Sequence, residues 1–163
     1  MHYSVIKIFS MVANFDVVVK NNFSVAVMVL SDSNGKIIHA VTKRLFTTDA
    51  SIRKAQAALL ASQIASSFEI YFLTLEGDAI NIILAIQQPN FFLDWNFASV
   101  ISNIRVNLLS LYSWKACKVF RNVNFCAHSL ARWVASNLIF GSILNWSPIL
   151  SFIQIRSGFD HLL

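Results

Sequence analysis

Residues 23–45 read FSVAVMVLSDSNGKIIHAVTKRL, and this stretch decides the fold class. Its outer parts, Phe23–Leu30 and Ile37–Leu45, are rich in β-branched and aromatic residues, which favour strands. Between them, Asn34 and Gly35 form a dipeptide that tolerates the positive backbone φ angles of a tight turn. The stretch therefore predicts an antiparallel β-hairpin.

The chain on both sides of this hairpin extends the sheet. Before it, Met11–Val19 has strand composition and can pair with the first hairpin strand through a turn at residues 20–22. After it, Thr48 or Asp49 can cap a helix, and strand and helix patterns then alternate. The order β-β-β-α-β-α-α-β-α predicts an α/β fold with a five-stranded mixed sheet flanked by helices. The elements expected after the cap are a helix to Ser66, a strand at Ile70–Leu75, helices from Ala79 to before Pro89 and at Phe97–Leu111, a strand at Trp114–Phe120 and a helix at Asn124–Ser136.

The composition suits one domain in a reducing compartment. A length of 163 residues is typical of a single domain. The two cysteines, Cys117 and Cys126, are too few for a disulfide framework or a four-ligand zinc site. The formal charge is +5, from 13 Lys and Arg against 8 Asp and Glu. Mild basicity suits a polyanionic partner, although a shortage of acidic residues explains the same charge equally well.

The apolar content calls for a test of membrane insertion. Hydrophobic residues make up 56% of the chain, and the mean hydropathy is +0.58. The best candidate span, Trp133–Ile155, is interrupted by polar residues and by Pro148, which makes it a poor spanning helix. No targeting signal is evident. A membrane partner is therefore not expected, and a small membrane-associated protein is kept as an alternative hypothesis.

Four short segments occur in an order, and on elements, that match one known family. They are Asn14-Phe15-Asp16 on the first strand, residues 31–36 (SDSNGK) in the hairpin turn, residues 75–78 (LEGD) after the fourth strand and residues 121–131 (RNVNFCAHSLA) at the last helix. With them the chain resembles ribonuclease H type 1, and most of all the reverse-transcriptase-like RNase H domain of plant non-LTR retroelements. The resemblance covers about residues 10–136, leaving residues 137–163 as an apolar C-terminal tail of unknown role.

The resemblance implies hydrolysis of the RNA strand in RNA–DNA hybrids. In that reaction water attacks a phosphate in line, and two divalent cations activate the water and stabilise the leaving oxygen. Mg²⁺ prefers oxygen ligands, so the family places acids on the first strand, the first helix, the fourth strand and the last helix. The corresponding catalytic positions here are Asp16, Gln56, Asp78 and His128.

Two of these four positions lack a carboxylate. Gln56 offers a neutral oxygen, which does not offset the charge of two dications. His128 offers a softer nitrogen ligand. Some plant relatives also have histidine at this position. Asp16 and Asp78 are then the expected metal ligands, and they would hold Mg²⁺ or Mn²⁺ weakly if at all. Val17 also stands where the family usually has a glycine that would let the hybrid backbone approach. We therefore expect a domain of hybrid endoribonuclease ancestry whose catalysis is impaired.

Nucleic-acid contacts are expected near the first turn and the last helix. Cations along a groove contact phosphates, and polar groups distinguish RNA through its 2′-hydroxyls. The expected partner is an RNA–DNA hybrid or RNA, with no small-molecule cofactor, and we expect a monomer located inside the cell, in the nucleus or cytosol. The residues expected to bind are Lys20, Lys118, Arg121 and Asn124, with Lys43, Arg44 and Arg132 as further candidates.

Several site residues also have a simpler interpretation. Asp78 can cap the helix that follows it, Asn124 can hydrogen-bond within its own loop, and His128 can be merely solvated. For the whole chain, a nucleic-acid-binding module without catalysis is the main alternative to an impaired nuclease. Hybrid cleavage separates these two functions.

Overall fold

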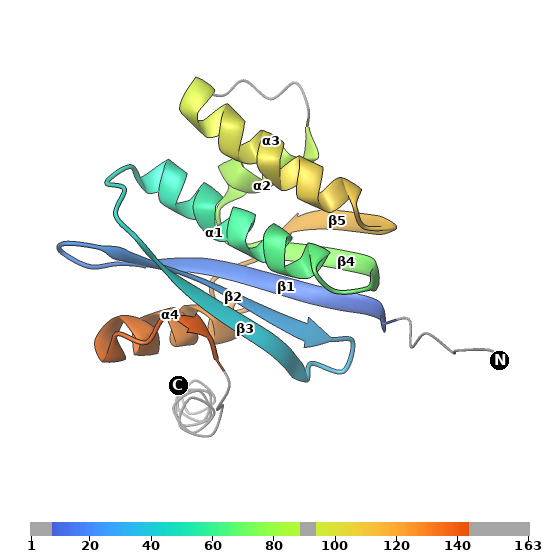
Figure 1. Cartoon of the computed structure of the whole chain (residues 1–163), viewed down its shortest axis with the longest axis horizontal. Coiled ribbons are helices and arrows are strands. Elements are labelled where there is room, and N and C mark those ends of the chain that lie inside the picture. The colour runs from blue at the N-terminus through green and yellow to red at the C-terminus, as the bar shows by residue number, and fades with distance from the viewer. Residues whose placement is uncertain (1–7, 89–93, 144–163) are drawn as a thin grey trace.

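The computed structural model describes residues 8–88 and 94–143, which form one mixed sheet with helices on both faces (Figure 1). Every element expected from the sequence is present in the expected order. The elements are β1 (Ile8–Val19), β2 (Ser24–Asp32), β3 (Ile37–Leu45), α1 (Ala50–Ser66), β4 (Ile70–Gly77), α2 (Ile80–Gln87), α3 (Trp95–Leu109), β5 (Ser113–Lys118), α4 (Phe125–Asn137) and β6 (Gly141–Ser142).

The strand order in the sheet is β5-β4-β1-β2-β3-β6. Strands β1, β2 and β3 pair antiparallel in succession, whereas β4 runs parallel to both β1 and β5. The predicted mixed sheet is confirmed, with six strands instead of five because the two-residue β6 adds to the edge at β3. A strand this short carries no periodic sequence signal, so β6 is not predictable from the sequence pattern.

The sheet separates two apolar cores. Side chains at alternate positions of β1, including Met11 and Phe15, are buried in the core that contains α1, α2 and α3. The opposite face packs against α4, where Val27 of β2 meets Leu130 and Val134. Figure 1 shows α1, α2 and α3 on one side of the sheet and α4 alone on the other. Central strand β1 thus presents one set of side chains to three helices and the other set to α4.

Local chemistry accounts for the predicted hairpin and helix start. Gly35 adopts a φ of +80°, whereas Asn34 does not take a positive φ, so only one of the two turn residues is left-handed. The Oδ1 atom of Asp32 accepts hydrogen bonds from the backbone N–H groups of Asn34 and Lys36, both at 2.9 Å, which closes this wider turn. At α1, Asp49 is the capping residue, since its Oδ1 accepts from the backbone N–H of Ile52 at 3.0 Å.

Part of the expected C-terminal tail continues the sheet. Leu138, with a φ of +54°, ends α4 in the left-handed conformation. Gly141 and Ser142 then pair with β3, and Ile143 is buried in the α4 core. Within residues 8–88 and 94–143, no helix has both the length and the apolar character needed to cross a bilayer. The remainder of the candidate span Trp133–Ile155, from residue 144 onward, lies outside the described residues.

Candidate active site

The candidate site lies where the parallel strands β1 and β4 end side by side. Their last paired positions are Asn14 and Glu76, and Asp16 and Asp78 each follow two residues later. Side chains two residues apart on a strand point to the same face, so Asn14 and Asp16 share one face of β1. As predicted, the two aspartates therefore occupy the carboxyl ends of adjacent strands.

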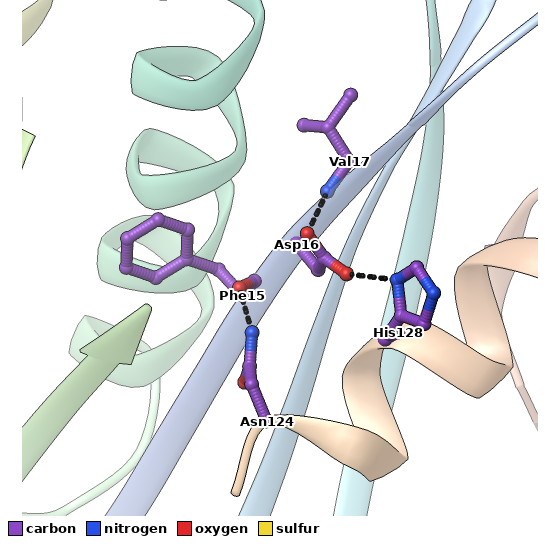
Figure 2. Close-up of polar contacts among 5 residues, drawn as sticks. All are labelled: Phe15, Asp16, Val17, Asn124 and His128. Carbon is purple, nitrogen blue, oxygen red and sulfur yellow. Dashed lines mark hydrogen bonds and ion pairs between the residues drawn. The ribbon is translucent and has the colours of Figure 1, made fainter. Parts of the chain in front are cut away.

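Asp16 is held by two hydrogen bonds, one from its own strand and one from α4. Its side chain is 6% exposed. Its Oδ1 atom accepts from the backbone N–H of Val17 at 2.8 Å, and its Oδ2 atom lies 2.8 Å from Nδ1 of His128 (Figure 2). The interpretation that His128 faces the site is confirmed, and the alternative of a merely solvated imidazole is wrong. Both carboxylate oxygens of Asp16 are thus used within the protein.

Burial raises the pKa of Asp16 above its ordinary value of 3.8, and the negative charge of Asp78 adds to this rise. The Val17 N–H and the His128 imidazole stabilise the carboxylate, which partly offsets the effect of burial on the pKa. The net direction is upward, so desolvation outweighs the two hydrogen bonds.

Asn124 anchors the start of α4 to β1. Its Nδ2 atom donates to the backbone carbonyl of Phe15 at 2.9 Å, and only 1% of the residue is exposed (Figure 2). This corrects two expectations, because the side chain neither bonds within its own loop nor lies where a nucleic acid would contact it. The backbone N–H of His128 donates to the Asn124 carbonyl at 3.1 Å, so His128 sits one helical turn from this anchor. Asn124 therefore sets the position from which His128 reaches Asp16.

Glycine is required at the end of β4 for a steric reason. A Cβ atom at Gly77 would collide with the ring of Phe15, which fills the space on the α1–α3 side of the sheet. A glycine at position 77 thus allows the Phe15 ring of β1 to pack directly against the end of β4. Gly77 belongs to the family segment at residues 75–78, and its close approach to Phe15 gives this glycine a physical role.

Among the described residues, Asp78 and Gln56 have no direct polar contact with the Asp16–His128 pair. Asp78 is half-buried. The N-cap residue of α2 is Ala79, and no side chain caps the helix, so the helix-capping interpretation of Asp78 is wrong. Gln56 is half-buried on α1. In the described parts of the chain, no hydrogen bond or ion pair joins either side chain to Asp16 or His128. Of the four expected catalytic positions, Asp16 and His128 are thus the pair joined by a direct contact.

These donors do not fit a pair of magnesium ions. Two-metal sites hold hard cations through several oxygen ligands. Within the described ranges there is no group of three or more His, Cys, Asp or Glu side chains arranged to hold a metal. Oδ2 of Asp16 would also have to exchange its contact with His128 for a metal bond. The site as folded is a hydrogen-bonded Asp–His pair beside a second carboxylate.

The expected nucleic-acid-binding cations divide into separate groups. Lys20 and Arg132 line a hollow together with His128. Lys118 is the last residue of β5, and Arg121 lies in the connection to α4. The Lys118 ammonium lies 3.9 Å from the centre of the Phe120 ring. The first group shares its hollow with His128, whereas Lys118 pairs with Gly77, the residue before Asp78.

One polar pair was not foreseen from the sequence. The Nδ2 atom of Asn14 donates to Oε2 of Glu76 at 2.9 Å, on the same face of β1 as Asp16. Alternation along β1 places Asn14 and Asp16 together, which is a signal available in the sequence. The identity of the partner required the strand register, because Glu76 is 62 residues away.

Comparisons with known proteins agree with this fold. A family model described as reverse transcriptase-like matches residues 14–134. No curated protein matches the sequence. The solved structure of RNase H1 from the halophilic archaeon Halobacterium salinarum NRC-1 aligns with a TM-score of 0.71 and 19% identity, over 78% of this chain and 98% of that one.

Two further structures show the same likeness. The N-terminal RNase H domain of a Mycobacterium tuberculosis protein has a TM-score of 0.72 at 9% identity, covering 79% of this chain and 95% of that one. LC11-RNase H1 in complex with an RNA/DNA hybrid has a TM-score of 0.68 at 12% identity, covering 79% and 99%. At such identities the likeness concerns the fold, and the predicted RNase H-like α/β fold is confirmed.

Proposed function

This chain belongs to the reverse transcriptase-like family, and we propose that it is a retroelement-derived RNase H-like domain that binds RNA–DNA hybrids or RNA and whose hydrolytic activity is impaired. The family match spans residues 14–134, and the structures of similar fold are RNases H, one of them bound to an RNA/DNA hybrid. Descent from a plant non-LTR element is the finer part of the proposal. It is supported by the segment at residues 121–131 (RNVNFCAHSLA), which has histidine at the last-helix position.

The observation that carries this proposal is the 2.8 Å contact between Oδ2 of Asp16 and Nδ1 of His128. It joins the end of β1 to α4, the two places from which the resemblance expects acids. An imidazole at this position holds Asp16 through a hydrogen bond, where a carboxylate would instead share a cation with it. A histidine in place of an acid removes one negative charge from this position, which supports an impaired site.

A divalent cation, if held, would rely on Asp16 and Asp78. Bound there, Mg²⁺ or Mn²⁺ would supply Lewis acidity and activate a water molecule. The chain's own residues oppose such binding, because Asp16 already accepts from Val17 and contacts His128, and Gln56 adds no charge. We therefore propose weak binding of a single ion at most.

A non-catalytic nucleic-acid-binding module is the second candidate function. It is favoured by the contacts of the Asp16 carboxylate, since both of its oxygens have partners inside the protein and neither is left free for a metal ion. In this case the pair would serve only to hold α4 against β1. The two functions differ in whether any hybrid is cleaved.

The deciding experiment is hybrid cleavage in Mg²⁺, repeated in Mn²⁺, by wild type, Gln56→Glu, His128→Asp and the double variant. Restoring both carboxylates should raise the rate more than either single change, because both would act on one metal site. Loss of one transition-state interaction costs about 10²- to 10³-fold in rate, so a gain of about 10²-fold is expected from the double variant. The matched control is Gln63→Glu, which adds the same charge on an exposed part of α1 and should leave the rate unchanged.

Two results would contradict the proposal. Wild-type cleavage as fast as that of the double variant would show that the site is not impaired. A folded double variant that binds hybrid and stays inert would show that the missing carboxylates are not the cause. The defect would then lie in substrate placement, for which Val17 is the first candidate.

A further inference from the structure

A continuous groove runs beside the Asp16–His128 pair, between α4 and the turn that joins β1 to β2. One hollow, of about 460 Å³, is bordered by Lys20, His128, Arg132 and Trp133. A second, of about 550 Å³, extends along the turn toward Leu138 at the end of α4. The hollows share Val19, Lys20 and Ser136, so they form one depression, here called the α4 groove.

The α4 groove is positively charged. Lys20 lies on the turn and Arg132 on α4, so the two cations stand on opposite walls. Both side chains are exposed. The described residues that line the groove include no Asp or Glu, and in residues 8–88 and 94–143 the ion pair found is the one between His128 and Asp16. Neither cation is neutralised by a carboxylate of the described chain.

The polar groups between these cations are neutral hydrogen-bonding groups. Asn21 and Asn22 belong to the turn, and their side chains make no hydrogen bond within the described parts of the chain. Ser136 and Asn137 instead donate to backbone carbonyls of α4, to those of Arg132 and Trp133. The groove thus offers two cations and two free amides, which suits a chain of phosphates that carries further polar groups.

The groove also connects with the candidate active site. His128 contributes to its wall while its Nδ1 atom faces Asp16 (Figure 2). The carboxylate of Asp16 is buried, and its Oδ2 atom contacts this imidazole. A bound phosphate chain would therefore run toward the pair without meeting an exposed carboxylate in the groove lining.

We propose that the α4 groove binds the phosphodiester backbone of an RNA–DNA hybrid, with Lys20 and Arg132 each contacting a phosphate from opposite walls. This inference rests on the proposed nucleic-acid-binding function and goes beyond it by assigning the binding face. It separates Lys20 and Arg132 from Lys118 and Arg121, which do not line the groove. The binding energy is expected to be mainly electrostatic, with counterion release at each contacted phosphate.

The test is fluorescence anisotropy with a short labelled RNA–DNA hybrid, and with single-stranded RNA and DNA of the same sequence as further arms. The proteins are wild type, Lys20→Ala, Arg132→Ala and the double variant, with Lys36→Ala/Lys54→Ala as a control of equal charge loss on exposed residues outside the groove. The groove double variant should bind the hybrid about tenfold more weakly than the control does, and its dependence of log K on log salt should fall by about 2.

Three results would overturn the assignment. Equal losses in the groove and control variants would show that general charge, and not the groove, drives binding. A larger loss in Lys118→Ala/Arg121→Ala would move the binding face to the β5–α4 connection. In both cases wild type still binds, so the proposed function survives and only the groove assignment fails. Wild type that binds none of the three probes would remove the proposed function together with the inference. Circular dichroism of each variant checks that these exposed substitutions leave the fold intact.

Discussion

The two faces of β1 carry different kinds of side chain on the same strand. Toward α1, α2 and α3, Met11, Ala13 and Phe15 enter an apolar core in which packing alone satisfies each residue. The alternate positions Asn14 and Asp16 share the face toward α4, and each has a specific polar partner. These partners, Glu76 and His128, come from distant parts of the chain.

The apolar face of β1 therefore contributes to the stability of the domain, whereas the polar face carries the candidate site residues. On the α1–α3 face, a substitution acts through volume, because the residues there carry no charge. On the α4 face it acts through hydrogen bonding and charge, because a buried polar group without its partner is costly. The α4 groove lies on this second face, so candidate chemistry and candidate binding are found together. The predictions below test this contrast.

The largest effect is expected for His128→Asp. This change removes the partner of Oδ2 of Asp16 and places a second carboxylate beside a buried one. At neutral pH, without divalent cations, the free energy of unfolding should fall by about 2–3 kcal/mol. The matched change Gln56→Glu, on a side chain without such a contact, should alter it by about 0.5 kcal/mol or less. Urea denaturation measures the free energy of unfolding of both variants. Equal losses would show that the contact between His128 and Asp16 does not distinguish the two positions.

A smaller loss is expected for Gly77→Ala, on the apolar face. The added Cβ meets the Phe15 ring, and relieving that overlap should cost about 2 kcal/mol of unfolding free energy. Since no charge is involved, the loss should be the same at about pH 5 and about pH 8, on either side of neutrality. Gly35→Ala is the control, because its space is open and only its φ of +80° is unfavourable, at about 1 kcal/mol. A loss at Gly77 no larger than at Gly35 would mean that the Phe15 ring moves aside easily.

The smallest effect is a pH dependence at Asp16. Because the folded pKa lies above the ordinary value of 3.8, the folded state binds this proton more tightly than the unfolded chain does. Wild type therefore loses stability from this group as the pH rises from about 3.8 through the folded pKa. Asp16→Asn does not titrate, so its stability relative to wild type should increase over that window and be constant below it. Thermal melts across the acidic range measure the difference, and a relative stability that decreases with pH would show that the pKa is lowered instead.

The order of elements was predictable because its signals are local. The Asn34-Gly35 turn, the Asp49 cap and the alternation of strand and helix patterns each act within a few residues. Adjacency of Asp16 and Asp78 followed from placing them on the first and fourth strands of a known arrangement, and the register bears it out. Asn124 was misread because its partner, the Phe15 carbonyl, is 109 residues away, and local bonding was the only alternative visible in the sequence.

What the sequence determined by itself is the kind of group at each position: two aspartates where acids are expected, a glutamine and a histidine where they are not, and cations spread along the chain. Whether His128 faces Asp16 or solvent was left open by the sequence. Only the tertiary structure decided it, by fixing α4 to β1 through Asn124 and so bringing together side chains 112 residues apart. A hydrogen bond forms only within a narrow range of distance and angle, and a side chain reaches that range when the packing of whole elements sets its position. Residue types are local information, whereas the Asp16–His128 pair and the acid-free lining of the α4 groove are properties of that packing.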